Sequence, residues 1–160
     1  MRVSTESYTD TRTINRVKTK ISIREKHVTD FRIASSTEEK ENVFRFRYRS
    51  YIDENIISPI SSELFSDSYD SNCNCYIFRL YLDNKMVSTV RLHVLSSETP
   101  VSPSYEVFSD LLDPLLDGGN VIIDPTRLAT TAEAAAKYKM LPYLTLKAAC
   151  MAIKLSLIHI

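Results

Sequence analysis

Alternating hydrophobic and polar residues predict the strands of this chain. Residues 75–82 and 86–95 are two β-branched and aromatic runs separated by Asp83-Asn84-Lys85, so they predict a hairpin. Residues 28–34 predict an earlier strand and 121–129 a later one. The later run contains Pro125, which removes one backbone donor and predicts an edge position or a bulge there.

Hydrophobic residues spaced at helical intervals predict helices between and after these strands. Hydroxyl residues and then two glutamates at 35–39 form a helix start, and this helix is expected to reach about Tyr51. Residues 108–116 predict a short helix broken around Pro114. A last helix is expected over 141–155, with an earlier one starting at 132–136.

The order of these elements predicts a mixed α/β (α+β) fold whose front half is antiparallel. The length of 160 residues, 44% of them hydrophobic, fits one globular domain. Residues 1–18 are polar and little patterned, so we expect a flexible polar leader followed by the domain at 19–160.

Charge and hydropathy limit where the protein acts. Twenty basic residues balance twenty acidic ones, which gives no general attraction to nucleic acid or to an anionic membrane. No run of eighteen apolar residues or secretory signal is present. The sequence therefore predicts a cytoplasmic protein without stable membrane insertion.

The cysteines and histidines show no metal-binding spacing. Three cysteines are an odd number without a Cys-x-x-Cys pair, so they are expected to be free thiols and no metal site is predicted. The three histidines share no spacing typical of ligands or of a triad. His93 is expected on the outer face of its strand.

Four short motifs occur in a defined order along the chain. On the first predicted helix an arginine precedes an aromatic residue by four positions, and before the hairpin two aspartates lie three positions apart. The second hairpin strand contains an Arg-Leu dipeptide. On the next strand an acidic residue precedes an arginine by three positions. In that order the residues are Arg47 and Tyr51, Asp67 and Asp70, Arg91-Leu92, and Asp124 with Arg127. Each motif alone is weak, but the ordered set is more specific.

This set, within residues 28–155, resembles the N-acyl amino acid synthases and the related acyl-homoserine-lactone synthases. The resemblance implies a GNAT-like mixed sheet flanked by helices. Because GNAT folds continue with further strands after the helix at 141–155, the chain is expected to be truncated at its C-terminus. The lactone synthases usually carry a tryptophan after the first helix, whereas this chain has Ile56 and Ile57 and no tryptophan. The resemblance therefore favours fatty-acyl transfer to the amine of an amino acid, with lactone synthesis as the alternative.

The expected chemistry requires a proton acceptor, because an amino acid carries an ammonium group at pH 7 and only the neutral amine attacks a thioester. Asp124 is the first candidate for this role and Asp70 the second. Arg91 and Arg127 can pair with the aspartates or hold the amino-acid carboxylate. The expected catalytic residues are Asp124, Asp70 and Arg127, and the expected substrate-binding residues are Arg47, Tyr51, Asp67 and Arg91.

The donor is expected to be the acyl-phosphopantetheine of an acyl carrier protein, with no bound cofactor. Residues 130–139 contain no glycine, so the glycine-rich loop that cradles the pyrophosphate of coenzyme A is missing. The carrier arm has a single phosphate, for which Lys137 and Lys139 suffice. The predicted partners are therefore an acyl carrier protein and an amino acid.

Simpler explanations exist for these residues. Asp67 and Asp70 lie in a Ser/Asp-rich segment that is typical of a turn. Arg91 lies in mid-strand, so it either faces solvent or is buried with a partner, and burial with a partner is favoured. A chain truncated as the resemblance implies could also be an inactive remnant that binds an acyl group or a partner.

Overall fold

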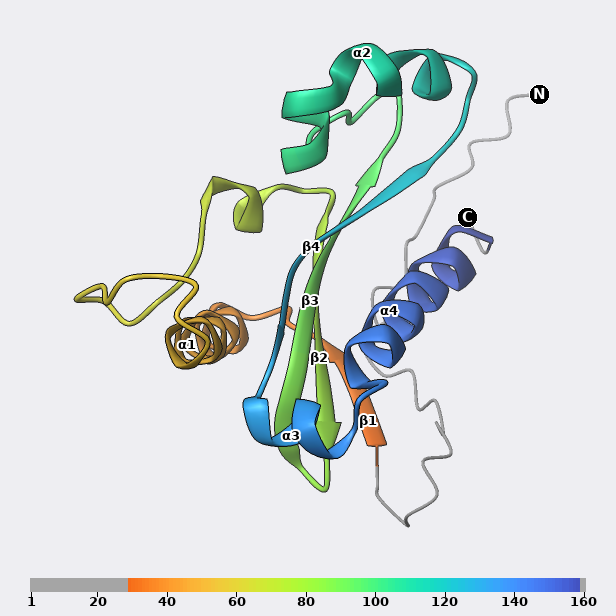
Figure 1. Cartoon of the computed structure of the whole chain (residues 1–160). Helices are drawn as coiled ribbons and strands as arrows, with labels where there is room; N and C mark the ends of the chain where they lie inside the picture. Colours follow the sequence, from red (N-terminus) through yellow and green to blue (C-terminus); the bar gives the residue numbers. More distant parts are fainter. Residues whose placement is uncertain (1–28, 159–160) are drawn as a thin grey trace.

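The structure, a computed structural model, describes residues 29–158 (Figure 1). The predicted leader at 1–18 and the start of the predicted domain lie outside the described residues. The elements in chain order are β1 Thr29–Ile33, α1 Thr37–Asp53, the short 3₁₀ helix η1 Ser68–Ser71, β2 Cys75–Leu82, β3 Lys85–Leu95, α2 Pro103–Asp117, β4 Ile122–Thr130, α3 Ala132–Lys137 and α4 Leu141–Ile158. The predicted mixed α/β fold is confirmed.

The four strands form one antiparallel sheet in the order β1-β2-β3-β4. The predicted hairpin is β2 and β3, joined by the two-residue turn Asp83-Asn84, and Lys85 already belongs to β3. Both turn residues have positive φ, 49° and 66°, which matches the twist of the paired strands. Asp and Asn tolerate this backbone region better than most residues.

Helices cover the two faces of the sheet (Figure 1). On one face, Phe78, Leu80 and Leu92 pack with Leu141 and Ile153 of α4 in the main hydrophobic core. Because side chains alternate across a strand, Ile77 of β2 faces the other side and packs with Val43 of α1. In the described part of the chain, no helix is long and apolar enough to cross a membrane.

Helix α1 begins where the sequence predicts. Ser36 accepts a hydrogen bond from the backbone of Glu39, and the Glu39 side chain accepts one from the Ser36 backbone. This reciprocal capping box satisfies two amides that a helix start leaves unpaired. Glu39 also pairs with the buried Arg79, which ties the start of α1 to β2.

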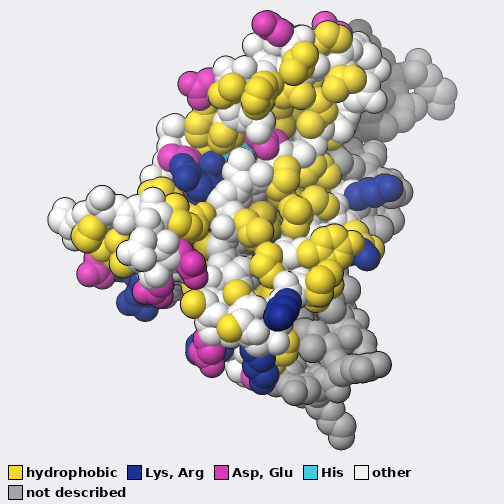
Figure 2. All heavy atoms as spheres, in the orientation of Figure 1, with side chains coloured by type: hydrophobic (Ala, Val, Ile, Leu, Met, Phe, Trp, Pro, Cys, Tyr) yellow, Lys and Arg dark blue, Asp and Glu magenta, His cyan; other side chains and the backbone are white. Residues whose placement is uncertain are grey.

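Helix α2 differs from the predicted short helix broken at Pro114. It begins earlier, at Pro103, because Ser102 caps the backbone of Tyr105 and proline is well tolerated in the first turn. The backbone breaks at Phe108, which has φ −124° and ψ 27°, while Pro114 lies inside the helix. Hydrophobic side chains gather over α2 in Figure 2, and the large exposed ones are Val107, Phe108, Leu111 and Leu115.

The bulge in β4 also lies away from the predicted position. β4 is the edge strand of the described sheet, as Pro125 indicated, but Pro125 pairs in register with Leu92. The register shifts two residues later, where Arg127 and Leu128 together lie opposite Val90. Arg127 has a φ of 53°, so the backbone strain of the bulge falls on a charged residue that the motifs single out.

Candidate active site

Five of the predicted site residues form one chain of ion pairs between α1, η1, β3 and β4. Arg47 Nη1 donates to Asp70 Oδ1 at 2.8 Å, and Arg91 Nη1 lies 3.2 Å from the same oxygen. Arg91 Nη1 also donates to Asp67 Oδ1 at 2.5 Å. The Nη2 of Arg127 lies 2.7 Å from Asp67 Oδ2. The geometry therefore brings together residues that are up to 80 positions apart in the sequence.

Exposure increases along this ion-pair chain. The side chains of Arg47, Asp70 and Arg91 are 0, 2 and 1% exposed, while those of Asp67 and Arg127 are 24 and 35% exposed. The exposed end borders a hollow of about 300 Å³ lined by Asp67, Tyr69, Arg91, Pro103, Thr126 and Arg127. The buried end is thus closed to solvent, and Arg127, at the hollow, is the most exposed of the five side chains.

Charge does not balance within the ion-pair chain, which has three arginines and two aspartates. Arg91 Nε donates to the Thr126 hydroxyl oxygen at 2.9 Å, so the guanidinium of Arg91 is held through Nε as well as through Nη1. Arg127 stacks over the ring of Phe65, with its central carbon 4.8 Å from the ring centroid. The surplus positive charge therefore lies beside the hollow in a fixed orientation, an arrangement that suits a carboxylate.

The segment η1 holds both aspartates in place. Asp67 accepts a hydrogen bond from the backbone of Tyr69, and Asp70 Oδ2 accepts one from the backbone of Asp67 at 3.0 Å. The turn-like composition of this segment is thus compatible with a place in the ion-pair chain. The turn fixes the two carboxylates, and both oxygens of Asp67 and Oδ1 of Asp70 bind the arginines.

Asp67 has a strongly lowered pKa. Burial alone raises the pKa of this carboxyl, but hydrogen bonds from Arg91 and Arg127 outweigh burial and lower it to about 2. Asp67 is therefore ionised at every physiological pH.

This pKa predicts an acid-dependent loss of stability. A carboxyl whose pKa is lower in the folded state stabilises the protein above its unfolded pKa, and this contribution disappears as the pH falls from about 4 towards 2. Asp67→Asn should remove it, so the unfolding free energy of the variant should change less over that range. Urea unfolding at several pH values measures the difference. An unchanged pH dependence in the variant would contradict the ion pairing of Asp67.

Asp124 lies outside the ion-pair chain. It is 7% exposed, and its two oxygens accept hydrogen bonds from Ser104, from the hydroxyl at 2.7 Å and from the backbone at 3.1 Å. It therefore anchors the start of α2 to β4. Thr126, two residues along the same strand, lines the hollow, so Asp124 lies next to the site without lining it.

Tyr51 joins α1 to the bulge. Its hydroxyl donates to the carbonyl oxygen of Leu128 at 3.3 Å, and its ring packs edge-on against Phe65. Burial raises the pKa of Tyr51, so the hydroxyl stays protonated as a donor. Tyr51 thus supports the bulge that carries Arg127, and it does not line the hollow.

Lys137, the last residue of α3, and Lys139, in the segment before α4, lie away from the ion-pair chain. Together with Tyr138 and Met140 they line a separate hollow of about 360 Å³ in front of the first turn of α4. Figure 1 places α3 beside the β2-β3 turn, at the end of the sheet where β4 ends. The structure therefore separates the predicted phosphate contacts from the predicted acceptor contacts.

His93 was expected on the outer strand face, and this expectation is wrong. Its side chain is fully buried on the same face as Arg91, its Nε2 lies 3.2 Å from the carbonyl oxygen of Tyr69, and its ring packs edge-on against the Tyr69 ring. Burial lowers the pKa of His93, which favours the neutral ring. The two-residue spacing from Arg91 was the sequence signal for a shared face.

The three cysteines are free, as predicted. Burial raises the pKa of Cys75 to about 11 and also raises that of Cys150, which makes both thiols poor nucleophiles.

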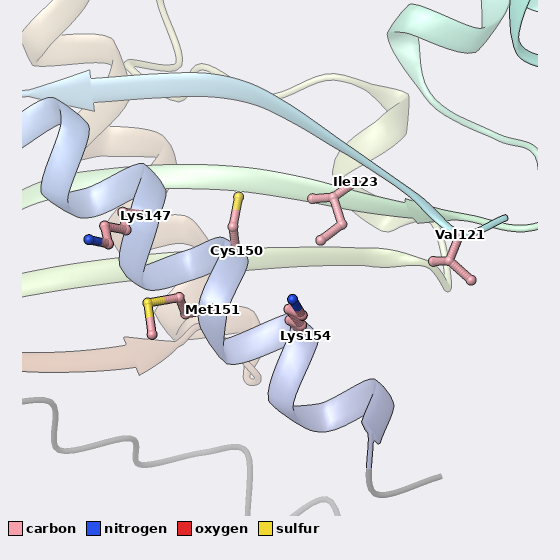
Figure 3. Close-up of a pocket in the computed structure, with 6 residues that line it drawn as sticks. All are labelled: Val121, Ile123, Lys147, Cys150, Met151 and Lys154. Carbon is pink, nitrogen blue, oxygen red and sulfur yellow. The ribbon is translucent and has the colours of Figure 1, made fainter.

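Cys150 and Ile123 face a groove of about 420 Å³ between α4 and β4 (Figure 3). The groove is mostly apolar and has two lysines, Lys147 and Lys154, but no carboxylate or histidine among its lining residues. Within residues 29–158, no group of His, Cys, Asp and Glu is suited to hold a metal ion.

Comparisons with known proteins support the family that the sequence resembles. Residues 42–160 match the family model described as N-acyl amino acid synthase FeeM. Among solved structures, the chain is similar to FeeM, an N-acyl amino acid synthase from uncultured soil microbes, with a TM-score of 0.51 and 14% sequence identity over 76% of this chain and 67% of that chain. None of the curated proteins matches the chain. At this identity the structural likeness shows a shared fold, while the family match covers well over half of the chain.

Proposed function

The chain belongs to the family of FeeM N-acyl amino acid synthases, which are acyltransferases, and from this premise we propose that Arg127 binds the carboxylate of the amino-acid acceptor in the hollow beside β4. The observation that carries the proposal is the exposed end of the ion-pair chain. Arg127 is the most exposed of its three arginines and is held by Asp67 through Nε and Nη2, at 3.1 and 2.7 Å.

The ion pairs support this role because they orient Arg127 before a ligand arrives. Two bonds to Asp67 and the contact with Phe65 restrict the guanidinium, so little side-chain freedom is lost on binding. The surplus positive charge then offsets the carboxylate of the amino acid. An acceptor that lacks a carboxylate loses this contact.

The amine of the bound amino acid must lose a proton before it attacks. We assign the acceptor of this proton to Asp124, acting through Ser104. Asp70 is held by two arginines, whereas Asp124 has no ion-pair partner among residues 29–158 and accepts a 2.7 Å hydrogen bond from the partly exposed Ser104 hydroxyl. The hydroxyl passes its proton to Asp124 as it takes one from the ammonium group.

The acyl transfer that follows needs no further reactant. The neutral amine nitrogen attacks the carbonyl carbon of the thioester, a carbon–nitrogen bond forms, and the carbon–sulfur bond breaks. The thiol leaves with a proton from the amine. The bulge at Arg127 and Leu128 lies beside this reaction, and Tyr51 keeps its backbone in place.

For the donor we propose the acyl-phosphopantetheine of an acyl carrier protein. The only acid between residues 131 and 160 is Glu133, while four lysines follow it, so this part of the chain favours an anionic group. Lys137 and Lys139 lie at its start, in front of the first turn of α4. One phosphate needs no glycine-rich loop.

Charge reversal tests the donor contacts. Lys137→Glu combined with Lys139→Glu should raise the KM for the acyl carrier protein about tenfold, as two weakened charge contacts would. The KM for the amino acid should not change. Acyl-pantetheine without the phosphate is the control, and an equal rise in its KM would contradict a phosphate contact.

The reaction is tested by mass spectrometry of lipids from cells that produce the chain. N-acyl amino acids are expected in these cells and should be missing when Arg127→Ala replaces the natural residue. Acyl-homoserine lactones in their place would favour the alternative that uses S-adenosylmethionine. No acylated product in either case would favour a binding protein over an enzyme.

A further inference from the structure

His93 is a buried side chain that the reaction outlined above does not use. It lies on β3 between Cys75 of β2 and Asp124 of β4, its partners in the strand register. Its ring is fully buried, and within the described residues its Nδ1 has no hydrogen-bond partner. A buried polar atom without a partner destabilises the folded state, so another interaction of this histidine should compensate for it.

The compensating interaction is the hydrogen bond of the other ring nitrogen, Nε2. A carbonyl oxygen can only accept, so the 3.2 Å contact between Nε2 and the Tyr69 oxygen requires the proton on Nε2. The neutral ring therefore carries its proton on Nε2 and leaves Nδ1 bare. Burial favours this neutral form.

The carbonyl that His93 holds belongs to η1. Tyr69 lies between Asp67 and Asp70 in this four-residue segment, and both aspartates bind arginines of the site. The turn is also held by its own internal hydrogen bonds, by those ion pairs, by the hydrogen bond of the Tyr69 hydroxyl to Glu106 and by Arg91, which lies over the Tyr69 ring. His93 is the side chain of the sheet that fixes the backbone between the two carboxylates.

We propose that His93 is a positioning residue that holds η1 against the sheet through its Nε2–H, and so sets the position of Asp67 and thereby of Arg127. The expected effect on the KM for the amino acid rests on the proposed function, whereas the hydrogen bond from His93 to η1 does not. The donor at the Nε2 position is the essential feature, and the imidazole ring as such is not.

Two amide variants separate the donor from the ring. The amide nitrogen of His93→Gln reaches about as far as Nε2 and can still donate to Tyr69, whereas the shorter His93→Asn reaches only the Nδ1 position. Hydrogen exchange of a peptide spanning residues 66–74, read by mass spectrometry, should be about five- to tenfold faster in His93→Asn and close to the natural rate in His93→Gln. Equal exchange in all three proteins, or equally fast exchange in both variants, would overturn the proposal.

Two further readouts complete the test. The KM for the amino acid should rise in His93→Asn and be restored in His93→Gln, while kcat changes less. If the natural protein makes no product, the proposed function fails, but the exchange result still decides the role of His93. If the variants do not fold, ¹⁵N resonances of the natural protein decide it, because a proton on Nδ1 instead of Nε2 would contradict the hydrogen bond.

Discussion

Arg127→Ala is expected to lower kcat/KM for the amino acid about 100-fold. The guanidinium is held by Asp67 at the edge of the hollow, and the loss of a bidentate contact to a carboxylate is worth about 2–3 kcal/mol. Because alanine keeps the backbone of the bulge and Asp67 retains Arg91, the protein should still fold. Steady-state kinetics with a fixed acyl donor measure the effect.

The matched controls for this variant are Arg127→Lys and Arg49→Ala. Lysine restores the charge but not the two-pronged guanidinium, so an intermediate loss is expected. Arg49 is exposed on α1 and belongs to no contact of the site, so its removal should leave kcat/KM unchanged. A full loss of activity in Arg49→Ala, or full activity in Arg127→Ala, would refute the assignment of the carboxylate to Arg127.

Arg47→Ala is expected to lower the free energy of unfolding by about 3–5 kcal/mol, the usual loss when one partner of a buried ion pair is removed. The side chain is fully buried and its Nη1 donates to Asp70, which is itself 2% exposed. After the substitution Asp70 retains Arg91 as its one arginine partner and the hydrogen bond from the Asp67 backbone, and a cavity is left beneath η1. Urea or thermal unfolding measures the loss.

Arg49→Ala again provides the comparison, because Arg49 is two residues away on the same helix but exposed. Its unfolding free energy should change by at most about 0.5 kcal/mol. If Arg47→Ala were as stable as Arg49→Ala, the buried end of the ion-pair chain would not support the fold.

The sequence predicted the elements and the members of the ion-pair chain better than their roles. Alternation and capping residues located the hairpin and the start of α1, because these signals act between neighbouring residues. The ordered motifs named Arg47, Asp67, Asp70, Arg91 and Arg127. Charge indicated that Arg91 and Arg127 could pair with the aspartates. The pair between Arg47 and Asp70, and the order of the residues from buried to exposed, depend on how η1 packs against the sheet, which no local pattern records.

Other features depended on tertiary contacts and were missed or misplaced. The bulge lies at Arg127 although Pro125 is the conspicuous residue, and at Leu128 its backbone accepts a hydrogen bond from Tyr51 of α1, a contact far away in the sequence. His93 faces inward because η1 packs over that part of β3. Asp124 pairs with Ser104 because α2 begins sooner than its hydrophobic pattern indicates.

The proposed role of Arg127 is to bind the carboxylate of the acceptor in an N-acyl transfer. The most direct measurement gives the purified protein an acyl carrier protein donor and a mixture of amino acids with their carboxamides, and compares the acylated products by mass spectrometry. We expect the free amino acids to be acylated in strong preference to the amides, and this preference to disappear in Arg127→Ala. Equal acylation of acids and amides by the natural protein would contradict carboxylate binding by Arg127.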